Sequence, residues 1–119
     1  MNSDELKLRT KQFALRIINL VDALPKTLVG RTLGAQLIRS GTSVAANYRA
    51  ACRARSKNEF ISKLGIVVEE SDESVFWLEM IIETRLLKQA LVESLLKEAS
   101  EITAIMVASV NSSRKNNKK

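Results

Sequence analysis

The stretch "SKNEFISKLGIVVEESDESVFWLEMIIETRLL", residues 56–87, decides the fold of this chain. It opens on the pattern S-x-x-E, in which Ser56 and Glu59 are expected to satisfy each other's free backbone amides at a helix start. Apolar and small residues then recur at spacings of three and four, which predicts one long amphipathic helix. The predicted core face consists of Phe60, Leu64, Val67, Ser71, Val75, Leu78, Ile82 and Leu86.

The segments on either side of this stretch predict three more helices. The first begins at Ser3 and ends near Leu24, because Pro25 cannot continue it. The second begins between residues 27 and 31, and "SGTS" at 40–43 is a candidate site for a kink. After a loss of phase around residues 88–94, a fourth helix has a core face formed by Leu95, Ala99, Ile102, Met106 and Val110.

Four helices with short connections predict an all-α, antiparallel four-helix bundle with up-down-up-down topology. We expect residues 1–110 to form this single domain and residues 111–119, "NSSRKNNKK", to form a basic polar tail. The composition agrees, since 45% of the residues are hydrophobic and the chain has only four Gly and one Pro. Such a chain is too apolar for disorder and too poor in turn formers for a sandwich or barrel.

Several classes of function lack the residues that they need. The chain has no His and a single cysteine, Cys52, so we expect no metal site, no cofactor and no disulfide within the chain. No nucleophile, base and oxyanion site come together in the sequence, so we expect no catalytic residues and no enzyme. Gly41 is expected to permit close contact between helices rather than to bind phosphate. The longest apolar runs are far shorter than the roughly 20 residues of a membrane span, which predicts a cytoplasmic protein.

The third helix carries more apolar surface than one core face needs. A helix that is apolar nearly all round is normally buried all round, and large apolar patches are rare on monomers. We therefore expect a homo-oligomer, although a flat core with scattered surface apolar residues remains an alternative. The predicted interface consists of Leu8, Leu15, Phe76, Trp77, Met80 and Ile81.

The net charge of +6 is unevenly spread along the chain. Residues 31–64 carry seven basic groups and one acidic group, whereas residues 65–101 carry three basic groups and nine acidic ones. On a continuous second helix the arginines would form one stripe, and the fork of donors on arginine matches phosphate oxygens. The predicted nucleic-acid-binding residues are Arg31, Arg39, Arg49, Arg53, Arg55, Lys57, Arg114 and Lys115.

The alternative is that these arginines pair with carboxylates of a neighbouring helix or subunit, or bind an acidic protein partner. We therefore expect a non-enzymatic homo-oligomer that binds the backbone of structured RNA or DNA. An assembly or adaptor module for an acidic protein is the competing hypothesis.

Residues 36–81, "QLIRSGTSVAANYRAACRARSKNEFISKLGIVVEESDESVFWLEMI", resemble the bacterial proteins encoded in intervening sequences of 23S ribosomal RNA genes. Residues 95–115, "LLKEASEITAIMVASVNSSRK", are similar to the last helix of that family. The resemblance implies a four-helix bundle that assembles as a ring-like homopentamer, without catalytic residues. It also implies kinship with the accessory variability proteins of diversity-generating retroelements, basic pentamers that bind nucleic acid and a reverse transcriptase. This chain departs from many family members in having "NYRAACRAR" where they have an acidic residue and a glycine, which makes the region more basic.

Overall fold

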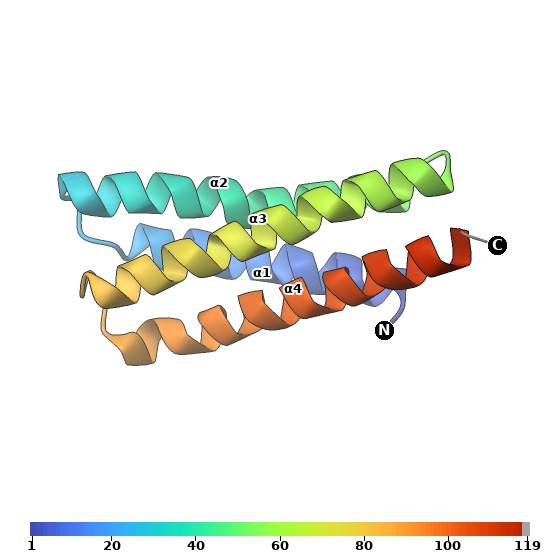
Figure 1. The fold of residues 1–119 in the computed structure, drawn as a ribbon. Coiled ribbons are helices and arrows are strands. Elements are labelled where there is room, and N and C mark those ends of the chain that lie inside the picture. Colours follow the sequence, from blue (N-terminus) through green and yellow to red (C-terminus); the bar gives the residue numbers. More distant parts are fainter. Residues whose placement is uncertain (118–119) are drawn as a thin grey trace.

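The computed structural model describes residues 1–117, which form four helices and no strands. The helices are α1 (Ser3–Asp22), α2 (Leu28–Cys52), α3 (Lys57–Glu83) and α4 (Gln89–Asn117). The α1–α2 and α3–α4 connections lie at one end, and the α2–α3 connection lies at the other end with the N-terminus and the end of α4 (Figure 1). The four helices pack into one elongated body of 51 × 21 × 19 Å. The predicted all-α fold with four helices is confirmed.

Side-chain caps fix where the first three helices begin. Asn2 caps α1, which begins at Ser3 as predicted, since the Asn2 Oδ1 accepts from the Glu5 amide at 2.9 Å. Thr27 caps α2 by accepting from the Gly30 amide. Ser56 caps α3 as predicted and accepts from the Glu59 amide at 3.1 Å. The second half of the expected capping box differs, because the Glu59 carboxylate accepts from the amide of Arg55 instead of Ser56.

The segment "SGTS" does not interrupt α2, which is helical from Leu28 to Cys52. Gly41 is buried against α1, and a Cβ atom on it would lie 2.8 Å from the Ile17 side chain. A separation that short cannot be accommodated without movement in a packed core. The prediction that Gly41 permits close contact between helices is therefore confirmed.

The buried face of α3 is rotated from the predicted one in its second half. Ser74, Leu78 and Ile81 are fully buried, whereas Val75 and Ile82 are only partly buried at the edge of the core. Serine fits here because hydroxyls meet between helices. The Ser74 and Ser40 oxygens are 2.9 Å apart, and the Ser71 and Thr103 oxygens are also 2.9 Å apart. Ser71 was on the predicted core face, but the pattern of apolar residues did not identify Ser74 as a buried polar position.

The fourth helix is longer than expected at both ends. It begins at Gln89, within the segment where the sequence pattern loses phase, and Val92 already lies in the core. Of the expected basic tail, residues 111–117 continue the helix, while residues 118 and 119 lie outside the described residues. Arg85, in the connection that precedes α4, has a φ of 59°, a left-handed conformation that is uncommon outside glycine.

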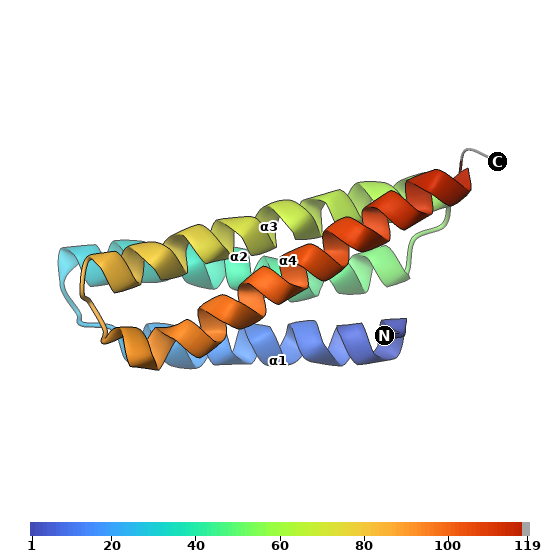
Figure 2. The ribbon, with the colours of Figure 1, turned by 60° about the horizontal axis from the view of Figure 1, so that its bottom comes forward.

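The packing between α1 and α4 is the least extensive among neighbouring helices. Figure 2 shows α4 close to α1 near the α3–α4 connection and then diverging towards the start of α3. Polar contacts bridge this seam, including one from Arg16 to the Ser94 hydroxyl at 2.7 Å. Within residues 1–117, none of the four helices carries an apolar stretch of the length that a membrane span requires.

Candidate functional site

The fold gathers five of the eight predicted nucleic-acid-binding residues at one end of the molecule. All eight side chains are exposed. The α2–α3 connection and the end of α4 lie at the same end (Figure 1), which brings together residues about 60 positions apart in sequence. We call this surface the basic end, and it consists of Arg53, Arg55, Lys57, Arg114 and Lys115.

The charges of the basic end are not neutralised within the chain. None of its five side chains forms an ion pair with another residue among 1–117. The carboxylate of Glu59 is nearby, but it contacts the backbone amide of Arg55, not the guanidinium. Exposed, unpaired arginine and lysine side chains are available to phosphate oxygens, which they bind through charge-assisted hydrogen bonds.

Arg39 differs from the other predicted residues because α3 already holds it. Its guanidinium donates to Glu70 at 3.2 Å and also to Glu73. This pairing, which the sequence left open as an alternative, offsets its charge. Arg31 lies near the start of α2, whereas Arg53 directly follows its last residue, so the length of helix between them is about 33 Å. The predicted stripe is therefore divided along α2.

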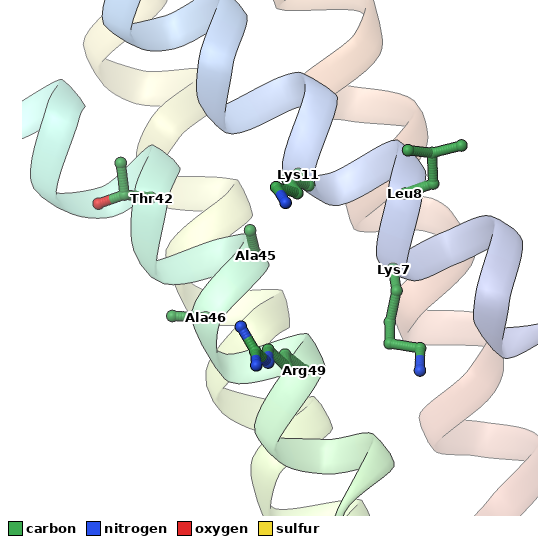
Figure 3. Close-up of a pocket in the computed structure, with 7 residues that line it drawn as sticks. All are labelled: Lys7, Leu8, Lys11, Thr42, Ala45, Ala46 and Arg49. Atoms are coloured by element: carbon green, nitrogen blue, oxygen red, sulfur yellow. The ribbon is translucent and has the colours of Figure 1, made fainter.

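Arg49 belongs to a second positively charged surface, between α1 and α2. Lys7 and Lys11 of α1 and Arg49 of α2 lie on either side of it (Figure 3). We call this cavity of about 570 Å³ the basic groove, and it is lined by Lys7, Leu8, Lys11, Thr42, Ala45, Ala46 and Arg49. Lys7 also pairs with Asp4 at 3.4 Å, whereas Lys11 and Arg49 form no ion pair with a described residue.

Sequence reasoning missed the two lysines of this groove. Their spacing of four residues places them on one face of the first helix, and that signal was present in the sequence. The packing of α1 against α2 was needed to show that this face lies beside Arg49.

The exposed side of α3 has the opposite charge. We call Glu69, Glu70, Asp72 and Glu73 the acidic patch, and with Arg39, Phe76 and Trp77 they line a shallow depression of about 640 Å³. Phe76 and Trp77 pack edge to face, with ring centroids 4.9 Å apart. The indole Nε1 of Trp77 is buried without a hydrogen-bond partner in the described residues.

The predicted interface residues differ in exposure. Leu8, Leu15 and Phe76 are 57%, 52% and 49% exposed, so three large apolar side chains remain in water in a single chain. Trp77 and Met80 are partly buried. Ile81 was assigned wrongly to the outer surface, because it is fully buried in the core of the single chain. The rotation of α3 that buries Ser74 also turns Ile81 inwards.

Tyr48 is a titratable residue that is buried in the core. Burial raises the pKa of the Tyr48 hydroxyl above its usual range, and a hydrogen bond with Cys52 acts in the same direction.

Among residues 1–117, no three Cys, Asp or Glu side chains gather closely enough to hold a metal ion. The chemistry that the described surfaces offer is recognition of anions at the basic end and in the basic groove, and of cations at the acidic patch.

Comparison with known proteins places these features in a family. Residues 5–108 match the family described as 23S rRNA-intervening sequence protein. A solved structure with a TM-score of 0.80 is 34% identical in sequence, and the match covers 93% of this chain and 99% of the other. It is a protein of unknown function from the S23 ribosomal protein family of Bacteroides thetaiotaomicron. The search of curated proteins found no match. The chain therefore belongs to the 23S rRNA-intervening sequence protein family.

Proposed function

We propose that this protein is a non-enzymatic, cytoplasmic homo-oligomer whose basic end binds the phosphate backbone of structured RNA or DNA. The observation that carries the proposal is the gathering of Arg53, Arg55 and Lys57 with Arg114 and Lys115, without an ion pair among the described residues. Backbone contacts of this kind supply affinity without sequence preference. The 23S rRNA in the family's name supports RNA as the first ligand to test.

Oligomerisation is supported by the exposed Leu8, Leu15 and Phe76, and the family resemblance favours a pentamer. Assembly would repeat the basic end once per subunit, so that one nucleic acid could contact several subunits and gain avidity. Kinship with the accessory variability proteins would add a protein partner to this scheme. Arg39 is left out of the proposed surface because Glu70 and Glu73 already offset its charge.

A binding titration with labelled duplex RNA, duplex DNA and polyglutamate tests this proposal. The variant Arg53→Gln/Arg55→Gln/Lys57→Gln should weaken RNA binding at 0.1 M salt by at least about tenfold and reduce the log–log salt slope by about 2. The matched control, Lys26→Gln/Arg31→Gln/Lys88→Gln, removes the same charge at the opposite end and should have a much smaller effect. Circular dichroism checks that both variants remain helical.

Three results would overturn the proposal. Equal losses in the two triple variants would show that only net charge matters. Tighter binding of polyglutamate than of either nucleic acid would favour the adaptor for an acidic protein. A mass near 13.3 kDa by light scattering would exclude the oligomer.

A further inference from the structure

The basic groove and the acidic patch are opposite in charge and lie on different helices. The groove has three cations, Lys7, Lys11 and Arg49, with Asp4 paired to the first of them. The acidic patch has four carboxylates, of which two hold Arg39. Each surface therefore retains an excess of its own charge, and the described residues include no ion pair between a cation of the groove and a carboxylate of the patch.

Each surface also presents apolar area next to its unpaired charges. Leu8, which is 57% exposed, lies at the α1 margin of the groove, and the small Ala45 and Ala46 line its α2 side. Phe76, which is 49% exposed, lies beside the acidic patch. A specific interface usually buries apolar side chains at its centre and has polar or charged residues around them.

We infer that the acidic patch of one copy docks in the basic groove of the next copy, so that Glu69 and Asp72 face Lys11 and Arg49 of its neighbour. The inference rests on the homo-oligomer in the proposed function and specifies how it is built. A contact between two different surfaces is heterologous, so it repeats from copy to copy and forms a ring if the rotation closes.

A closed ring requires the groove and the acidic patch to lie at similar positions along the long axis of the bundle. The two surfaces meet this requirement. The Ser40 and Ser74 hydroxyls are 2.9 Å apart, so these positions of α2 and α3 are level. From there the antiparallel helices place Thr42 and Ala45 of the groove within about one or two turns of the level of Asp72 and Glu69.

A symmetric pairing of α3 with α3 is disfavoured, because it would bring two acidic patches together, and juxtaposed like charges are costly. Nucleic acid in the groove is a separate possibility for the test. The proposed docking leaves the basic end free, since Arg53, Arg55 and Lys57 line no part of the groove.

Charge reversal tests the docking by light scattering of the full chain at 0.1 M salt. We expect the groove variant, Lys11→Glu/Arg49→Glu, and the patch variant, Glu69→Lys/Asp72→Lys, each to fall towards 13.3 kDa. The quadruple variant that combines them should regain the wild-type mass, because both charges of each contact are exchanged. The control Glu79→Lys/Glu83→Lys, further along α3, should keep the wild-type mass. Circular dichroism verifies that every variant is helical.

The outcomes separate this inference from the proposed function. A monomeric wild type would overturn both the oligomer and the docking. A groove variant that keeps its mass would overturn the docking alone, and if it also lost RNA binding, the groove would be assigned to nucleic acid instead. Loss of mass in the patch variant only, without rescue in the quadruple variant, would indicate a symmetric contact through α3. RNA binding by the basic end is measured with different residues and can succeed or fail independently.

Discussion

Arg9 of α1 holds Glu98 of α4 at two points, with Nε 2.8 Å from Oε2 and Nη2 2.7 Å from Oε1. Glu101 accepts a further hydrogen bond from the same guanidinium at 3.0 Å. The hydrogen bond to Glu98 is the main reason that the pKa of Arg9 is raised further above its usual range. This pair bridges the two neighbouring helices with the least extensive packing, so it is expected to matter more than most surface ion pairs.

We predict that Arg9→Met lowers the free energy of unfolding by about 2 kcal/mol, because it removes charged hydrogen bonds and leaves the partly buried Glu98 unpaired. Urea denaturation followed by circular dichroism measures the change. The control, Lys7→Met, removes a more exposed ion pair with Asp4 and should cost no more than about 0.5 kcal/mol. Equal effects of the two substitutions would contradict the special role of Arg9.

Two glycines within helices should respond in opposite directions to alanine. Gly41→Ala places a Cβ 2.8 Å from the fully buried Ile17, and we expect a net destabilisation of about 1–2 kcal/mol. Gly65→Ala meets no atom within 4 Å, so its better helix propensity should stabilise the protein by about 0.5–1 kcal/mol. Thermal unfolding of both variants gives the comparison, and stabilisation by Gly41→Ala would show that α1 and α2 can separate easily.

Tyr48 makes stability depend on pH in alkaline solution. Burial raises the pKa of its hydroxyl in the folded state, so above about pH 10 the unfolded chain loses a proton that the folded chain retains. Its contribution to stability is complete below that pH and is lost as the pH rises, by at most about 1.4 kcal/mol per pH unit. We predict that the wild type loses stability more steeply than Tyr48→Phe between pH 10 and 11.5 in urea titrations. Parallel curves would show that Tyr48 ionises equally well when folded.

The helices could be predicted from sequence because their signals are local. Ser56 caps α3 as its S-x-x-E pattern indicates, and Leu64, Val67 and Leu78 are buried as their spacing predicts. The second half of α3 could not be placed in the same way. Ser74 is buried because Ser40 of another helix supplies a partner, and this contact depends on how two helices pack.

The residues of the candidate site could also be predicted only in part. The sequence shows which segments are rich in arginine, but it does not show which of three surroundings each arginine occupies in the fold. Arg39 turns towards α3 and its carboxylates, Arg49 joins Lys7 in the basic groove, and Arg53 stays at the basic end. Each outcome depends on the angle at which a side chain leaves α2 and on which helix lies beside it.

The N-terminus and the end of α4 lie at the same end of the bundle as the α2–α3 connection, which affects how the protein can be tagged (Figure 1). A fluorescent protein fused before α1 or after α4 would lie at the same end as the basic end and would obstruct a long polyanion. Residues 23–27 and 84–88 connect helices at the far end, and exposed connections are the sites that tolerate insertion best. A reporter inserted there would be held away from the basic end by most of the 51 Å length of the bundle.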